Sequence, residues 1–396
     1  MKLDSVKVFV VSNPPPSFGG RYFVFLKLKT TCGIEGVGEV YVATFGPHTV
    51  ASMIEDVFMR RFEGRDPFQI ESIWRESYGS GFSLRPDLSL MGVVSGLEMA
   101  CWDIIGKAVE QPVYNLLGGK VHERLRSYTY LYPADGEGDE FYHDAERSAE
   151  RATEYVEQGF TGLKFDPLGG FSSYDPRQPT QEALERTVRL TRLVREAVGN
   201  RADLLIGTHG QFTTSGAIRL AKHLEPFDPL WFEEPVPPEM PEQMAIVARA
   251  TSIPIATGER LTTKYEFARV LSVGAANILQ LNLGRVGGLL EAKKVAALAE
   301  VHYAQIAPHL YCGPVVGAAN IQIATCSPNF LILESIQQWG GFHADILKKP
   351  IRWEDGYVIP PTAPGLGVEL NEEVALANPY PSDGKLHLEM IDRPLG

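Results

Sequence analysis

The sequence predicts an α/β protein: a (β/α)7-8 barrel of the TIM type with an α+β capping domain that the C-terminal tail completes. From Arg126 onward, short apolar segments alternate with amphipathic stretches, which is the pattern of repeated βα units. The chain has 396 residues, and a barrel takes roughly 250, so a smaller second domain fits. We expect the capping domain over residues 1–125, the barrel over 126–350, and residues 351–396 to pack back onto the cap.

The N-terminal region predicts a sheet followed by helices. Three segments rich in β-branched and aromatic residues, separated by glycine turns, favour antiparallel strands: 6–11, 22–29 and 36–42. Helical periodicity follows in residues 48–59, 67–78 and 91–108. This α+β unit ends near the glycine pair Gly118-Gly119.

The second region predicts eight parallel strands, namely 127–131, 162–166, 203–208, 230–234, 255–259, 277–282, 305–309 and 330–334. Helical stretches lie between them, for example 182–197, 216–224, 240–250, 265–271, 288–302 and 315–325. Such units close most economically into a barrel whose reactive groups sit at the C-terminal ends of the strands. After residue 351 the glycine-rich and proline-rich chain indicates turns and a hairpin, with no further βα unit.

Composition excludes some classes of function. The net charge is −12, and the longest basic clusters are pairs such as Lys293-Lys294, which argues against a nucleic-acid partner. The start of the chain lacks a signal-type apolar run, and no long uninterrupted apolar stretch occurs, so we expect a cytoplasmic protein without a membrane. The four cysteines are widely spaced, as is typical of reduced thiols.

Seven consecutive predicted strands, from the second to the eighth, end in polar or charged residues: Lys164-Phe165-Asp166, Thr208-His209, Glu233-Glu234, Glu259-Arg260, Asn282, His309 and Glu334. In a barrel these ends converge on one mouth. We therefore expect residues that are far apart in the sequence to form a single site.

Glu233 and Glu259 end successive strands, one βα repeat apart, so they can lie side by side around one cation. Oxygen ligands suit a hard divalent ion, and Mg²⁺ is the first candidate. The alternative is that each glutamate pairs with a lysine or an arginine.

Several motifs together resemble the enolase superfamily, mandelate racemase subgroup, and within it sugar-acid dehydratases of the galactonate dehydratase type. They are Glu233-Glu234-Pro235, Gly258-Glu259-Arg260, Gly287-Gly288, Pro308-His309, Leu333-Glu334, Trp102-Asp103-Ile104, Leu116-Leu117-Gly118-Gly119-Lys120 and Pro364-Gly365-Leu366-Gly367. The resemblance covers nearly the whole chain. It also implies a homo-oligomer.

The resemblance implies Mg²⁺-assisted dehydration of an aldonic or aldaric sugar acid, through an enediolate, to a 2-keto-3-deoxy acid. Such chemistry needs positive charge and donors at the substrate oxygens. By position, Lys164 would bridge the substrate carboxylate and the metal region, and His309 would be the base. His209 would be the acid that assists hydroxide departure, and a protonated Glu334 would donate to the enediolate. Each of these side chains could instead have an ordinary structural role.

The sequence departs from the family pattern at two positions. Gly207 stands where the family has an acidic metal ligand, and Asn282 stands where it has an aspartate that orients the histidine. Possible replacement ligands are Asp166, His209 itself or extra water. We expect Asn282 to accept a proton from the His309 ring, and Gly207→Asp to have room for a carboxylate that tightens Mg²⁺ binding.

Two rival functions remain open. A racemase, epimerase or cycloisomerase acting on a carboxylate sugar would share the enediolate step. A catalytically silent carboxylate-binding protein would keep the fold, and Gly207 and Asn282 favour it. Under the dehydratase hypothesis, cap loops at residues 17–20 and 79–84 would contact the far end of the substrate.

Overall fold

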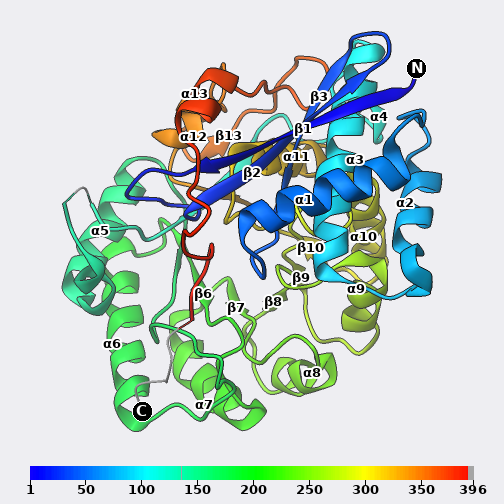
Figure 1. The fold of residues 1–396 in the computed structure, drawn as a ribbon. Helices are drawn as coiled ribbons and strands as arrows, with labels where there is room; N and C mark the ends of the chain where they lie inside the picture. Colours follow the sequence, from blue (N-terminus) through cyan, green and yellow to red (C-terminus); the bar gives the residue numbers. More distant parts are fainter. Residues whose placement is uncertain (135, 391–396) are drawn as a thin grey trace.

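The computed structural model describes residues 1–134 and 136–390, and within them parallel strands form one closed barrel (Figure 1). Strands β4 to β10 pair in chain order, and β11 pairs with β4. A parallel bridge between Ile306 and Phe330 closes the remaining gap. The eight strands are β4 (Leu125–Tyr130), β5 (Gly162–Phe165), β6 (Asp203–Gly207), β7 (Trp231–Glu233), β8 (Ile255–Thr257), β9 (Ile278–Leu279), β10 (Gln305–Ile306) and β11 (Leu333–Ser335).

A helix follows each of the first seven barrel strands: α5 (Ala145–Glu157), α6 (Gln181–Val198), α7 (Thr214–Leu224), α8 (Pro241–Arg249), α9 (Thr263–Ser272), α10 (Leu289–Val301) and α11 (Pro314–Thr325). The eighth strand is followed by the short helix α12 (Phe342–Asp345), and two 3₁₀ turns are η3 (Asp139–His143) and η4 (Glu225–Phe227). The predicted fold class is therefore confirmed. Helix α5 lies outside the helical stretches predicted above.

Most barrel strands are buried along their whole length, because parallel strands are covered on both faces. All four residues of β5 are buried. One cluster of buried side chains combines residues of several strands: Tyr128, Leu205, Trp231, Ala256, Ile278, Ala307 and Ile332. Strands β8, β9 and β10 end two or three residues earlier than predicted, so Glu259, Asn282 and His309 lie just beyond the ladder. These residues are free to turn toward the mouth.

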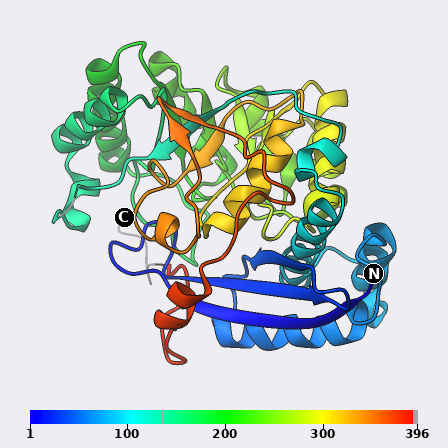
Figure 2. The same cartoon turned by 90° about the horizontal axis from the view of Figure 1, so that it is seen from above.

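The capping unit is a three-stranded antiparallel sheet with helices. Its elements are β1 (Leu3–Ser12), β2 (Tyr22–Thr30), β3 (Glu35–Val40), α1 (Pro47–Val57), the π-helix η1 (Phe58–Phe62), α2 (Ile70–Tyr78), the 3₁₀ turn η2 (Ser80–Phe82), α3 (Leu88–Ala108) and α4 (Val113–Leu116). Figure 2 shows the sheet beside the barrel, with α1 on its outer side. Helix α3 has the length and hydropathy of a membrane span, but 78% of the relevant window is buried inside the protein.

The chain after β11 contacts both the barrel and the capping unit. Strands β12 (Trp353–Glu354) and β13 (Tyr357–Val358) form the predicted hairpin, and β13 pairs with β4 of the barrel. Helix α13 (Glu372–Ala377) leads to a bridge between Val11 of β1 and Pro379. The tail thus contacts the cap, as expected, although residues 391–396 lie outside the described part of the chain. The domain boundaries at 125 and 350 stay a prediction.

Candidate active site

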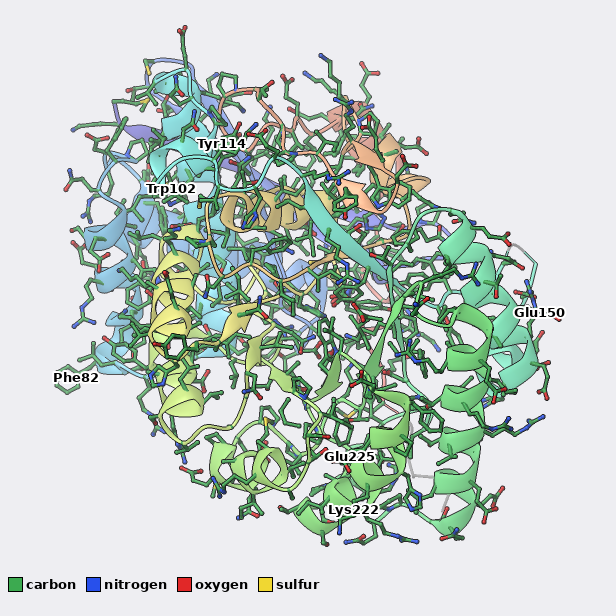
Figure 3. All side chains as sticks on the ribbon, turned by 180° about the vertical axis from the view of Figure 1, so that it is seen from behind. Phe82, Trp102, Tyr114, Glu150, Lys222 and Glu225 are labelled. Atoms are coloured by element: carbon green, nitrogen blue, oxygen red, sulfur yellow. The ribbon has the colours of Figure 1, made fainter. Side chains whose placement is uncertain are left out.

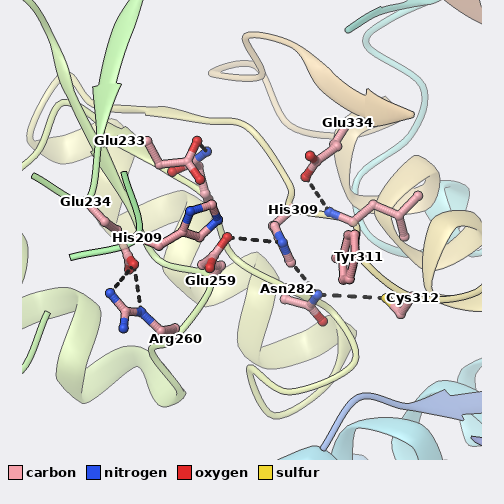
Figure 4. Close-up of polar contacts among 12 residues, drawn as sticks. His209, Glu233, Glu234, Glu259, Arg260, Asn282, His309, Tyr311, Cys312 and Glu334 are labelled. Atoms are coloured by element: carbon pink, nitrogen blue, oxygen red, sulfur yellow. Dashed lines mark hydrogen bonds and ion pairs between the residues drawn. The ribbon is translucent and has the colours of Figure 1, made fainter. Parts of the chain in front are cut away.

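Polar residues from the strand ends surround one cavity of about 420 Å³ at the mouth of the barrel. The predicted site residues that line it are Lys164, Asp166, His209, Glu259, His309 and Glu334. Two others stand directly behind this wall, because Glu233 bonds to Lys164 and Asn282 bonds to His309 (Figure 4). The structure therefore brings together all eight residues that the sequence predicted.

Lys164 and Glu233 form a buried ion pair. The Lys164 Nζ donates to Glu233 Oε1 at 2.6 Å, and the other carboxylate oxygen accepts from Trp231 Nε1 at 3.0 Å and Gln280 Nε2 at 2.7 Å. Burial by itself lowers the pKa of Lys164, but the facing carboxylates, Glu233 first, hold this pKa well above its ordinary value. The side chain is therefore a fixed ammonium at the cavity wall.

Glu334 faces the same ammonium at a longer distance. Its Oε1 lies 3.8 Å from Lys164 Nζ, and its Oε2 accepts from the Leu310 backbone N–H at 2.7 Å. Burial raises the pKa of Glu334. This direction favours a protonated carboxyl, which can donate a hydrogen bond into the cavity.

His309 faces Glu259 across the centre of the site. The His309 Nε2 and Glu259 Oε2 atoms are 3.1 Å apart. Burial lowers the pKa of His309 to about 4, which makes the imidazole neutral near pH 7.

Asn282 holds the other ring nitrogen of His309, with its side chain reversed from expectation. Its Oδ1 accepts from the Gly284 backbone N–H at 2.8 Å. Since that N–H can only donate, the Asn282 amide nitrogen faces His309 Nδ1, 2.8 Å away. Asn282 therefore donates to His309, and the expectation that it accepts is wrong. A neutral His309 carries its proton on Nε2, which points at Glu259. The Asn-Leu-Gly sequence is an Asx-turn pattern, a local signal that could have revealed this orientation.

His209 and Asp166 form a second imidazole–carboxylate pair. Asp166 Oδ2 lies 3.1 Å from His209 Nδ1. Burial by itself lowers the pKa of His209, but Asp166 outweighs it and raises this pKa to about 9. The backbone of His209 has a φ of 49°, a left-handed conformation that few residues other than glycine adopt. Such strain is common at functional sites.

Gly207 has no room for a larger side chain. A Cβ atom built on Gly207 would lie 2.0 Å from Asp166 Oδ1 and 3.3 Å from Lys164 Cε. The expectation that Gly207→Asp finds free space is therefore wrong, because Asp166 from the neighbouring strand end already fills that volume.

One group of side chains fits a metal ion. A ligand atom from each of His209, Glu233 and Glu259 lies within 4.8 Å of the others. Asp166 Oδ1 is buried without a hydrogen-bond partner, and among the described residues Glu259 Oε2 has no partner besides His309 Nε2, 3.1 Å away. Buried carboxylate oxygens of this kind are costly unless a cation pairs with them. The donor set thus fits a divalent cation, with the two predicted glutamates in it.

Aromatic side chains that were not predicted as site residues form much of the remaining cavity wall. They are Tyr41, Tyr130, Tyr132, Tyr142, Phe171 and Tyr311, joined by Leu388 from the C-terminal tail. Several of these residues follow barrel strands at the same mouth, as Tyr132 and Tyr311 do, so strand-end position was the available signal. Leu388 had no such signal.

The two cap loops predicted to meet a substrate differ in position. Ser17, Phe18 and Gly20 line a second cavity of about 440 Å³, which shares Tyr132, Tyr142, Tyr311 and Leu388 with the first. Phe18 stacks on Tyr132 with ring centroids 4.2 Å apart. Among the described residues that line the two cavities, none belongs to 79–84. Phe82 is 94% exposed and projects from the edge of the molecule (Figure 3).

A capped barrel with carboxylates and imidazoles converging at its mouth is the architecture of enolase-type enzymes. Comparison with known families agrees: residues 147–374 match the enolase C-terminal domain-like family, and residues 6–118 match the mandelate racemase/muconate lactonizing enzyme N-terminal domain. The chain belongs to the mandelate racemase/muconate lactonizing enzyme family of the enolase superfamily.

Relatives and solved structures cover nearly the whole chain. A D-gluconate/D-galactonate dehydratase of Picrophilus torridus is 34% identical over 376 residues, which is 94% of this chain and 93% of the relative. A D-galactonate dehydratase of Xanthomonas oryzae pv. oryzae is 34% identical over 371 residues, which is 91% of this chain and 92% of the relative. A structure of the mandelate racemase/muconate lactonizing enzyme type from Labrenzia alexandrii is 64% identical, covers 100% and 99% of the two chains, and has a TM-score of 0.97.

Proposed function

We propose that this protein is a metal-dependent hydro-lyase that removes water from an aldonic or aldaric sugar acid and yields a 2-keto-3-deoxy acid. The observation that carries the proposal is the buried Lys164 ammonium beside Glu334 and the candidate metal ligands, all at one cavity. A volume of about 420 Å³ is in the range of small-molecule sites. The dehydratase names of relatives that match nearly the whole chain support the same reaction.

Glu233 and Glu259 would hold the ion. Two carboxylate ligands completed by water molecules favour Mg²⁺. The bound ion would supply positive charge near the substrate carboxylate, which makes the adjacent proton more acidic.

Lys164 and Glu334 stabilise the charge that develops on the substrate. The Lys164 ammonium binds a carboxylate oxygen, since it is fixed at the cavity wall by Glu233. Burial raises the pKa of Glu334, and in its protonated form this carboxyl would donate to an enediolate oxygen. Both groups are in place before the substrate arrives, so little reorganisation is needed during the reaction.

His309 is the proposed base, and the Asn282 amide must rotate before His309 can accept a proton. To receive a proton at Nε2, His309 must carry its other proton on Nδ1, so the Asn282 amide must turn its oxygen toward the ring. The turn gives up the hydrogen bond from Gly284 N–H, at a cost of about 1–3 kcal/mol. His209 is the second imidazole in the cavity and could protonate the departing hydroxide, as the sequence predicted.

One observation favours a silent carboxylate-binding protein as the second candidate. The Asn282 amide donates to His309 Nδ1, so the ring presents a proton to the cavity where a base needs a lone pair. Such a protein would bind sugar acids without turnover.

The test is a screen of purified protein with matched aldonic and aldaric acids, with Mg²⁺ added. A dehydratase gives a 2-keto product whose mass is lower by one water. Conversion without mass change would identify an isomerase. Binding of an acid by calorimetry, with neither product nor α-proton exchange in deuterated water, would identify the silent protein and contradict the proposal.

A further inference from the structure

We propose that His209 is itself a ligand of the metal ion, oriented by Asp166, and that this ligand shifts the preference of the site from Mg²⁺ toward Mn²⁺. The inference deepens the proposed function and rests on its metal requirement, not on the identity of the sugar acid. It replaces the acid role of His209, because a ring bonded to the ion at Nε2 and to Asp166 at Nδ1 has no proton to give to a departing hydroxide.

The geometry resembles a carboxylate–histidine–metal arrangement. A ring nitrogen of His209 lies within 4.8 Å of ligand oxygens of Glu233 and Glu259. The Nδ1 atom is held by Asp166 Oδ2 at 3.1 Å, so Nδ1 keeps its proton and Nε2 offers its lone pair to an ion that displaces the second proton of the ring. Histidines that bind metals usually donate their other ring N–H to a carboxylate in this way, which fixes the tautomer and the ring orientation.

Gly207 makes this arrangement possible. Asp166 Oδ1 occupies the space in which a Cβ of residue 207 would lie, 2.0 Å away. A carboxylate at position 207 and the Asp166–His209 pair therefore exclude each other. The absence of an acidic residue at 207 is coupled to the presence of an oriented imidazole.

An independent observation indicates that a cation completes the cluster. Glu259 is only 8% exposed and lines the cavity. Among the described residues its Oε2 has no partner besides His309 Nε2 at 3.1 Å, so a lone pair is left for an ion. Glu233 is fully bonded by Lys164, Trp231 and Gln280, yet each carboxylate oxygen has two lone pairs, so it can also bind an ion.

The donor set decides the preferred metal. Mg²⁺ favours oxygen ligands and retains several waters. Imidazole suits first-row transition metals, and the general order of affinity rises from Mn²⁺ onward. One imidazole with two carboxylates is a mixed nitrogen–oxygen set, which Mn²⁺ accepts more readily than Mg²⁺.

Pulsed electron paramagnetic resonance on the Mn²⁺-loaded wild-type protein tests the ligand directly. We expect coupling from a coordinated imidazole nitrogen, and its absence from protein with Mn²⁺ bound would overturn the inference. Because this spectrum needs no variant, a folding defect cannot obscure it.

Variants identify the nitrogen. His209→Gln should remove the coupling and weaken Mn²⁺ binding at least about 10-fold more than Mg²⁺ binding, measured by calorimetry. Asp166→Asn should keep the coupling and weaken Mn²⁺ binding about 10- to 100-fold. The exposed His223 of α7 offers a matched control, because His223→Gln should change neither. Coupling that persists in His209→Gln would assign the nitrogen to another residue, such as His309, and overturn the inference.

The two proposals fail separately. Nitrogen coupling without dehydration of any acid would contradict the proposed function and support the ligand assignment. Dehydration without nitrogen coupling would support the proposed function and contradict the ligand assignment.

Discussion

Buried carboxylates occur in two regions of this molecule, the barrel mouth and the contact between cap and barrel, and their partners differ. At the contact, Glu39 of β3 accepts from the Gly313 and Val316 N–H groups at 2.5 and 2.9 Å, at the start of α11. Glu98 of α3 accepts from the N–H groups of Leu289 and Leu290 at the start of α10, at 2.7 and 3.0 Å. These cap residues bond to otherwise unpaired donors at helix N-termini of the barrel.

The mouth carboxylates have different partners. Glu233, Glu259 and Asp166 face lysine or histidine side chains from other strands. Asp166 Oδ1 has no hydrogen-bond partner, and Glu259 Oε2 faces a histidine ring at the cavity. Burial alone therefore does not mark a functional carboxylate. Two oxygens that both bond to N–H groups at the start of a helix indicate a structural role, whereas carboxylates that face ionisable side chains around a cavity are candidate ligands.

The largest expected effect is that of Glu259→Gln on activity. The amide keeps the shape but loses the charge that would hold the ion, so kcat/KM should fall on the order of 1000-fold. Burial by itself raises the pKa of Glu259, but the facing His309, His209 and Lys164 lower it below its ordinary value, so the ionised carboxylate stabilises the fold and its loss should lower the melting temperature. Steady-state kinetics and a melting curve check both. Activity within 10-fold of wild type would show that this carboxylate is not a ligand.

At the contact region the expected loss is in stability. Glu39→Ala leaves two helix N–H groups buried without partners, at about 1–3 kcal/mol each, so the free energy of unfolding in urea should fall by about 3 kcal/mol. Glu35→Ala, at an exposed position on the same strand, is the control and should cost less than about 1 kcal/mol. Equal losses of unfolding free energy in Glu39→Ala and Glu35→Ala would show that the buried hydrogen bonds of Glu39 stabilise the protein no more than an exposed glutamate does.

The pH dependence of stability gives a third test. Burial raises the pKa of Glu98 from 4.5 to about 7, so the folded protein keeps a proton that the unfolded chain releases. The stability from this group is therefore fully present below pH 4.5 and falls by about 3 kcal/mol as the pH rises to about 7. Unfolding free energies across this window should decrease by about 3 kcal/mol less in Glu98→Gln than in wild type, since burial also raises the pKa of Glu39, to about 8, in both proteins. Parallel curves would contradict the assignment.

The smallest effect concerns a carboxylate added at the mouth. In Asn282→Asp the side chain accepts from both Gly284 N–H and a proton on His309 Nδ1, so His309 presents a lone pair to the cavity without an amide rotation. α-Proton exchange in deuterated water should rise about 10-fold, the equivalent of about 1.4 kcal/mol. A fall in exchange would mean that His309 acts as a donor, and Lys164 or His209 would then be the base.

Much of the fold was predictable because its signals are local. Apolar runs, helical periodicity and turn residues located all eight barrel strands. The predicted strand ends at residues 166, 234 and 334 lie within one residue of the observed ends, since a polar residue after a buried run marks the point where a strand reaches the mouth. Asn282 shows a local signal that was overlooked, because its bond to Gly284 spans only two residues.

By itself, the sequence determined the order of the strands and the chemical groups at their ends, because both depend on neighbouring residues along the chain. Only the tertiary structure decided that Asp166 fills the space beside Gly207 and holds His209. Strands β5 and β6 pair Phe165 with Ile206, which places the next residues, Asp166 and Gly207, side by side. That register, and the side-chain packing which follows from it, depend on contacts between distant segments, so no local pattern contains them.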